Sequence, residues 1–177
     1  MEQVQSVEIS KLGFVPQKLG DLLEHEGPLL SLYVDRDNPE NYFLYKWVDS
    51  NEECNRWAIL PCTSKDLLAF FEGEKPLREL FLNKPFCFVI DLDEHLQIQS
   101  IQIIATEALP EEFLPSEKSF FKAEAFSVFA TSYHNILKQK ANDPMGNVLK
   151  ELSELKASQA ETTRALYDLI KQREVTH

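Results

Sequence analysis

The stretch from residue 29 to residue 62, LLSLYVDRDNPENYFLYKWVDSNEECNRWAILPC, decides the fold. It contains three runs of apolar and β-forming residues, at 29–35, 42–49 and 56–62. The polar segments DRDNPEN and SNEE separate these runs, and Asp, Asn and Pro favour turns over strands. Successive strands joined by short polar loops predict an antiparallel meander.

The residues that follow predict two short helices and a hairpin. Thr63 or Ser64 is placed to cap a first helix, and Pro76 suits the first turn of a second. Residues 86–92 then form an apolar run, which the acidic turn DEH separates from residues 96–104. In this last segment isoleucines are interleaved with glutamines, which is typical of a strand with one solvated face.

The segments that flank this block are less regular. Residues 1–18 suit either a short strand or an arm, whereas residues 19–26 predict a short helix that Gly27-Pro28 ends. Apolar residues recur at helical spacing over 127–140, which predicts a helix covering the sheet, with an extra strand before it left open. The predicted fold class is α+β: an antiparallel sheet of about five to six strands with short helices packed on it, then a long, coiled-coil-like C-terminal helix.

The triplet Asn142-Asp143-Pro144 predicts where this C-terminal helix begins. Asp143 can accept hydrogen bonds from exposed backbone amides, and proline fits the first helical position. We therefore divide the chain into an acidic α+β head domain, 1–141, and a C-terminal oligomerisation helix, 142–177. The formal net charge of −11 lies entirely within residues 1–144, because residues 145–177 carry five basic and five acidic side chains.

Composition argues against several classes of partner. An acidic head without a cluster of Lys and Arg repels phosphate backbones, so we expect no direct nucleic-acid binding. The N-terminus lacks the features of a signal peptide, and no apolar run approaches the ~20 residues of a membrane span. Three widely spaced cysteines without a CxxC pair suit reduced thiols. We expect a cytoplasmic protein that does not contact membranes.

The predicted C-terminal helix carries a narrow apolar stripe with alternating spacings of four and three residues. Its members are Val148, Leu152, Leu155, Gln159, Thr162, Leu166 and Leu169. This heptad seam suits either a helix lying on its own head or a helix packing against other helices. We favour self-association into a homo-oligomer, because the stripe is narrow and follows the polar hinge KQKANDP. The polar pair Gln159 and Thr162 would then fix register and oligomer state.

No arrangement of residues in the sequence predicts catalysis. The four histidines have no metal-ligand spacing, and five glycines are too few for most phosphate cradles. Asp91, Asp93 and Glu94 at a strand end could bind Mg²⁺, but no lysine stands at a nuclease-like spacing and they suit an acidic hairpin turn better. We therefore expect no metal, no cofactor and no enzyme activity.

An aromatic strand offers the best candidate for a recognition surface. Phe43, Tyr45 and Trp47 alternate along it, and Trp57 lies on the next strand. The alternate positions are also apolar, which predicts a central strand covered on both sides and a role in the core. If one face were open, these side chains would form a surface for a partner protein, since Tyr and Trp dominate binding hot spots.

The block at residues 19–104 resembles a family of small bacterial domains of unknown function. The resemblance rests on Gly27-Pro28 before the first strand, the strand ending in Trp47-Val48-Asp49, Trp57 on the next strand, and leucine-rich helices after Ser64. It implies a bacterial source and a small α+β head. It implies no catalytic residues and does not include the C-terminal helix.

These observations predict a non-catalytic, oligomeric interaction or assembly protein that self-associates through its C-terminal helix. Oligomerisation would multiply weak contacts made by the head. The alternative is an accessory or regulatory subunit of a bacterial defence or mobile-element system, whose C-terminal helix docks a different protein. An enzyme with an unfamiliar site is the third hypothesis.

Overall fold

The computed structural model describes residues 11–175, without the side chains of Pro144, Asn147, Val148 and residues 169–175. The chain forms two compact units, one ending at Asn135 and one beginning at Ile136, and each is described by itself. The expected boundary between residues 141 and 142 falls inside the second unit. Helix α4 (Val128–Ala141) contributes its first half to the first unit and its second half to the second.

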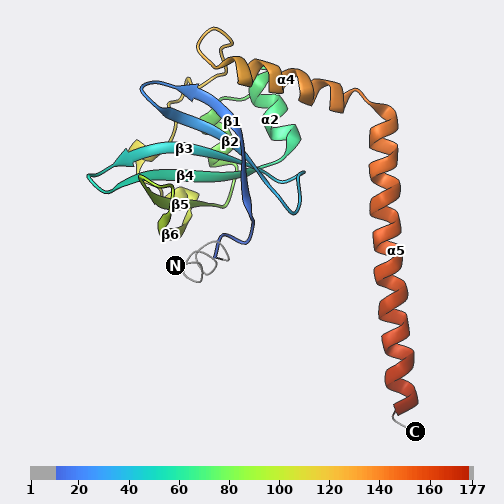
Figure 1. Cartoon of the computed structure of the whole chain (residues 1–177). Coiled ribbons are helices and arrows are strands. Elements are labelled where there is room, and N and C mark those ends of the chain that lie inside the picture. Colours follow the sequence, from blue (N-terminus) through green and yellow to red (C-terminus); the bar gives the residue numbers. More distant parts are fainter. Residues whose placement is uncertain (1–10, 176–177) are drawn as a thin grey trace. The chain divides into compact units, whose positions relative to one another are not determined.

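The first unit is built on a six-stranded sheet in which every strand pairs antiparallel with its neighbour in sequence (Figure 1). The strands are β1 (Pro16–Glu24), β2 (Pro28–Asp35), β3 (Tyr42–Ser50), β4 (Cys54–Cys62), β5 (Phe86–Asp93) and β6 (Ile98–Ala105). The predicted meander, the hairpin and the α+β class are thus confirmed. The turn after β1 contains Gly27, whose φ of 141° favours glycine.

Two short helices, α2 (Ser64–Phe71) and α3 (Leu77–Leu82), connect β4 to β5. The first begins with a capping box: Asp66 N donates to Thr63 Oγ1 over 3.1 Å, and Thr63 N donates to Asp66 Oδ2 over 2.9 Å. The 3₁₀ turns η1 (Thr106–Ala108) and η2 (Glu111–Phe113) then lead from β6 towards α4.

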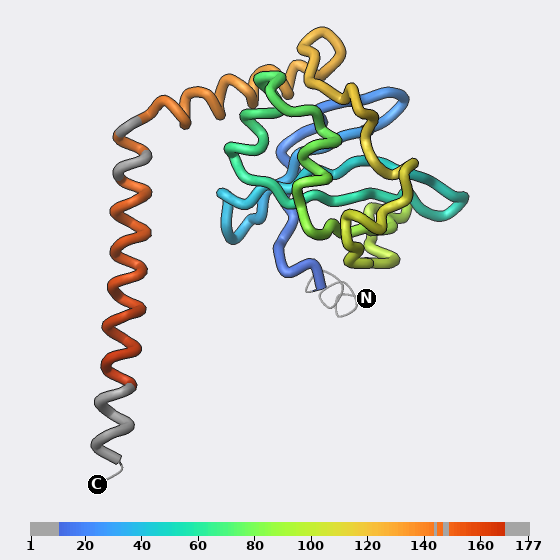
Figure 2. Tube along the Cα trace, turned by 180° about the vertical axis from the view of Figure 1, so that it is seen from behind, coloured from blue at the N-terminus to red at the C-terminus, as the bar shows by residue number. Residues whose placement is uncertain are grey.

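One face of the sheet packs against these helices. Figure 2 shows α2 and α3, coloured green, on the same side of the sheet. Leu44 and Leu60 are opposite each other on β3 and β4 and are fully buried. Phe70 of α2 and Phe81 of α3 are equally buried. Burial of aliphatic and aromatic side chains, at roughly 1.5–3 kcal/mol each, therefore holds the helices to the sheet.

The other face packs against the segment that precedes β1. Leu12 and Phe14 belong to a buried cluster on this face, and the Phe14 ring stacks on that of Phe43 with a centroid distance of 3.6 Å. The Phe14 ring also meets Phe88 of β5 edge-on at 5.9 Å. The segment crosses the strands on the side away from α2 (Figure 1). Both faces of the central strands are therefore covered.

Two sequence predictions are wrong. Residues 19–24 belong to β1 instead of a helix, and residues 25 and 26 lie in the turn after it. The register of β1 with β2 shifts between Lys18 and Gly20, between Asp21 and Leu23, and between Leu23 and Glu24. These shifts break the strict alternation of a strand, so the leucines can stand at the spacing of a helix. The extra strand left open before α4 does not exist, since residues 114–127 contain only turns, bends and irregular backbone.

The contact between β1 and the first half of α4 can be tested at Gly20. A Cβ atom added to Gly20 would lie 2.7 Å from the Phe129 ring, which is closer than van der Waals contact allows. We expect Gly20→Ala to lower the free energy of unfolding by about 1–3 kcal/mol, as overpacking does elsewhere. The loss of unfolding free energy caused by Gly20→Ala should be smaller in a Phe129→Leu background, because the ring that the added Cβ meets is absent. Urea denaturation measures both losses. Equal penalties in the two backgrounds would contradict this packing.

Candidate interaction surfaces

The second unit contains the long helix α5 (Pro144–Val175), which begins where the sequence predicts. Asp143 Oδ1 accepts hydrogen bonds from Met145 N and Gly146 N, each over 3.1 Å. The Asp143 carboxylate thus satisfies two of the amides that a helix start leaves without partners. The predicted N-cap role of Asp143 is confirmed.

The predicted seam of α5 is exposed wherever its side chains are described. Leu152, Leu155 and Leu166 are 49%, 58% and 56% exposed, and Gln159 and Thr162 between them are exposed as well. The side chains of the two outermost seam positions, Val148 and Leu169, lie outside the described residues. All side chains from residue 149 to 168 are exposed, so the described leucines of the seam present an apolar stripe to water.

The aromatic strand belongs to the core instead of forming an open surface. Phe43, Tyr45 and Trp57 are buried, and only Trp47 of the four candidate residues is partly accessible. All four lie in or against the cluster that the segment before β1 covers. Trp47 Nε1 donates to Asn55 Oδ1 over 3.1 Å at the end of the sheet. The sequence left open whether these side chains pack in the core or form a surface for a partner protein. The geometry places them in the core.

Two tyrosines of this cluster are held in their neutral form. The rings of Tyr33 and Tyr45 stack with a centroid distance of 3.9 Å. Burial raises the pKa of Tyr33 to about 12, with a smaller contribution from the charge of Asp21, and burial raises the pKa of Tyr45 as well. A phenolate would lose its hydration here, so neither tyrosine is set up to act as a base near neutral pH.

Asp91, one of the carboxylates with a possible metal role, forms a structural ion pair. Its Oδ1 accepts from Arg56 Nε over 2.8 Å and its Oδ2 accepts from Arg56 Nη2 over 3.0 Å. Ser100 Oγ donates to the same Oδ2 over 2.7 Å. These donors join β4, β5 and β6, since each residue comes from a different strand. Both oxygens of the carboxylate are therefore occupied by protein groups.

Asp93 has an equally local role in the hairpin turn. Its Oδ1 accepts from the backbone amides of His95 and Gln97, each over 2.9 Å, and its Oδ2 accepts from Gln99 Nε2 over 2.8 Å. Glu94 extends into solvent. Among the side chains that the structure describes, no group of three or more His, Cys, Asp or Glu is placed to hold a metal ion. Asp93 and Glu94 thus belong to the hairpin turn, whereas Asp91 joins neighbouring strands.

The ion pair gives stability a defined dependence on pH. The hydrogen bond from Arg56 lowers the pKa of Asp91, so the folded state favours the ionised carboxylate. The stability that the Arg56–Asp91 pair contributes is fully present above about 3.9, the pKa of this carboxyl in the unfolded chain. It is lost as pH falls through the lower pKa of the folded state.

We expect Asp91→Asn to lower the free energy of unfolding at pH 7, measured by urea denaturation. The decrease should be smaller near pH 2, where Asp91 of the wild type is protonated. The exposed control Glu94→Gln should have little effect at either pH.

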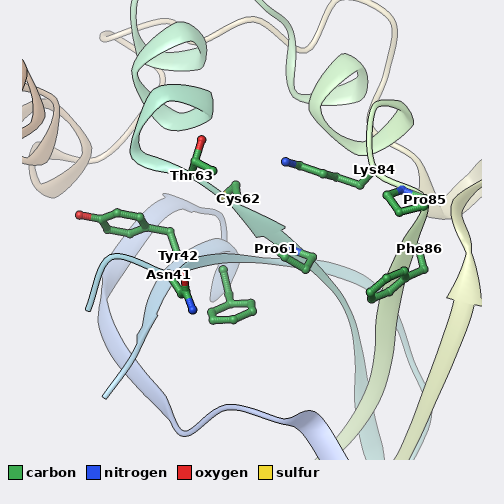
Figure 3. A pocket seen from close by; sticks show the side chains of 9 residues that line it. Asn41, Tyr42, Pro61, Cys62, Thr63, Lys84, Pro85 and Phe86 are labelled. Atoms are coloured by element: carbon green, nitrogen blue, oxygen red, sulfur yellow. The ribbon is translucent and has the colours of Figure 1, made fainter. Parts of the chain in front are cut away.

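A shallow cavity of about 330 Å³ lies where β3 begins and β4 ends (Figure 3). Pro61 and Phe86 form part of its wall, and Lys84 extends along it towards α2. The Lys84 ammonium pairs with Asp66 at 2.8 Å, and burial raises the pKa of the Cys62 thiol. A paired lysine and a protonated, buried thiol give this cavity no activated nucleophile.

Comparison of the chain with family models, with curated proteins and with solved structures gives no match. The resemblance of residues 19–104 to small bacterial domains therefore stays an expectation from the sequence. Within the described part of the chain, no helix combines the length and the apolar character needed to cross a membrane. The α5 seam places three exposed leucines on one stripe of one helix, so it is the leading candidate for a functional surface.

Proposed function

We propose that the protein is a non-catalytic assembly protein that self-associates through α5 and uses its first unit to contact another protein. The exposed seam of α5 carries this proposal. Leu152, Leu155 and Leu166 stand on one stripe with about half of each side chain in water. A stripe of this kind is unfavourable on a helix without partners, and packing against a second helix removes it from water.

The position of the polar residues supports a partner helix of the same sequence. Gln159 and Thr162 interrupt the leucines in the middle of the stripe. When identical helices pair in parallel and in register, each polar layer meets itself and each leucine layer meets leucine. A partner with an unbroken apolar seam would leave these polar groups against hydrocarbon, which costs free energy.

Charge on the helix flanks is compatible with the same arrangement. Glu151 and Lys156 occupy positions beside the seam, five residues apart. In a parallel pair of helices in register, Glu151 of one copy lies beside Lys156 of the other. Such exposed pairs contribute a few tenths of a kcal/mol each, so they select orientation more than they add strength.

Self-association through the seam can be tested with charge. We expect the double variant Leu155→Glu and Leu166→Glu to be monomeric, or to have fewer subunits than the wild type, in analytical ultracentrifugation. Glutamate carboxylates would have to be buried at the interface. Tyr167→Glu adds one glutamate at a 73% exposed position outside the seam and should leave the subunit number unchanged.

The outcome separates the proposal from its alternative. A wild-type chain that is monomeric at all concentrations contradicts self-association through α5. If that monomeric chain binds a heterologous protein, and the double variant loses the complex, the helix of an accessory or regulatory subunit is the better description.

The polar centre of the seam gives a second test. We expect Gln159→Leu to raise the thermal midpoint of the α5 assembly, because a polar layer is replaced by apolar packing. The same change should also give assemblies with a mixture of subunit numbers in place of one, as removing a buried polar residue does in other coiled coils. Circular dichroism and sedimentation velocity measure the two effects. Lys150→Leu, on the outer surface of α5, is the matched control. An unchanged midpoint and a single subunit number for Gln159→Leu would contradict a buried polar layer.

A further inference from the structure

The two edge strands of the sheet, β1 and β6, differ in how their outer sides are protected. An edge strand presents unpaired backbone N–H and C=O groups, which can pair with a strand from another chain. Proteins block this pairing with charges, proline, irregular register or a covering segment. The order of the sheet makes β1 and β6 its only edges among the described residues.

The β1 edge has all of these protections. Pro16 starts the strand, and Lys18 and Asp21 form a salt bridge of 2.7 Å on it. Its register with β2 shifts three times. Its backbone is also engaged by the segment before α4: Ser127 N donates to Leu22 O over 2.9 Å, and Ser127 Oγ donates to Asp21 O over 2.5 Å. The β1 edge is thus closed to another strand.

The β6 edge has almost none of them. Its sequence, IQSIQIIA, contains no charged residue and no proline, and Ile103 is 63% exposed. The backbone of residues 98–105 makes hydrogen bonds with β5 and with no other segment of the described chain. The eight residues of β6 exceed the roughly 5–6 residues of a typical strand, so the edge is long enough to template another. An exposed, neutral edge with apolar side chains is unusual for a protein that stays monomeric.

We propose that β6 is a second interface for self-association, in which two copies pair their β6 strands antiparallel about a two-fold axis. The two six-stranded sheets would join edge to edge into one continuous sheet. This inference does not rest on the α5 proposal, because the two surfaces belong to different units of the chain.

Self-complementarity of β6 favours a second copy as its occupant. A two-fold axis through Gln102 places this residue opposite its own copy and Ile101 opposite Ile103 of the other chain. Both isoleucines belong to the same face of the sheet, since their partners on β5 are Ile90 and Phe88. Opposed apolar and opposed amide pairs are both favourable across antiparallel strands.

Charge gives a second argument for this occupant. The chain carries a net charge of −11, so two copies repel each other over most of their surfaces. The β6 edge offers a neutral strip where two copies can meet without like charges on opposing residues. At the ends of the pairing, Gln97 of one copy would lie opposite Glu107 of the other, which also avoids a like-charge pair.

The test isolates this edge in a full-length chain whose α5 seam carries Leu155→Glu and Leu166→Glu. In this background we expect reversible dimerisation of the 20.4 kDa chain in sedimentation equilibrium. Ile103→Lys should weaken the dimer by about tenfold or more, because it removes two cross-strand isoleucine pairs and brings in two lysines. Leu82→Lys adds the same charge at a 51% exposed position on α3 and should have no effect.

Cross-linking tests the register of the pair. In a Cys54→Ser version of the same background, Gln102→Cys should form a disulfide-linked dimer on mild oxidation. Directly opposed residues of antiparallel strands have Cα atoms about 4.5–5.5 Å apart, which suits a disulfide. Gln99→Cys is the control, because the two copies of residue 99 would be separated by roughly 20 Å of strand.

The results either support or overturn the β6 interface. Dimerisation that Ile103→Lys weakens and Leu82→Lys does not, with cross-linking at position 102, supports it. A background chain that stays monomeric, or equal effects of the two lysine variants, overturns it. Cross-linking at position 99 in place of 102 overturns it as well. One outcome supports the β6 interface and contradicts the α5 proposal. In it, Leu155→Glu with Leu166→Glu leaves the mass of the wild-type assembly unchanged, whereas Ile103→Lys lowers that mass.

Discussion

The pairing of β3 with β4 is the constraint on which the rest of the first unit depends. Leu44 and Leu60 face one side of this pair, and Phe43, Tyr45 and Trp57 face the other. Neither side can be left in water, so the chain must supply two covers. The helices α2 and α3 supply one. The short segment that carries Leu12 and Phe14 supplies the other, which is why an apparently featureless stretch before β1 is part of the core.

Most of this architecture can be predicted from local patterns. The strands β2 to β6, the cap at Thr63 and the N-cap at Asp143 are each encoded by residues close together in sequence. β1 could not be predicted this way, because its pairing with β2 includes shifts of register, so its apolar residues do not alternate as those of a regular strand do. Tertiary pairing overrode the local pattern at this point.

Of the two proposed interaction surfaces, the sequence alone locates one and not the other. The α5 seam is a periodic feature of one helix, so the sequence alone locates it. The β6 edge depends on which strand ends the sheet, and that information is absent from the strand itself. The sequence did contain one usable sign, because IQSIQIIA is an eight-residue strand without charge in a chain whose net charge is −11. The aromatic residues were also located from the sequence, because apolar residues at the alternate positions predicted a strand covered on both sides, and Phe43, Tyr45 and Trp57 are buried.

The sequential order of the strands has a consequence for the speed and sequence of folding. Each strand pairs with the next one along the chain, so the sheet can grow by closing short loops, which costs little chain entropy. Several contacts lie far outside this pattern, among them Phe14 with Phe88, and Ser127 with Asp21. They close much longer loops and are therefore expected late. A chain emerging during synthesis would complete its meander first and cover the second face and the β1 edge only afterwards.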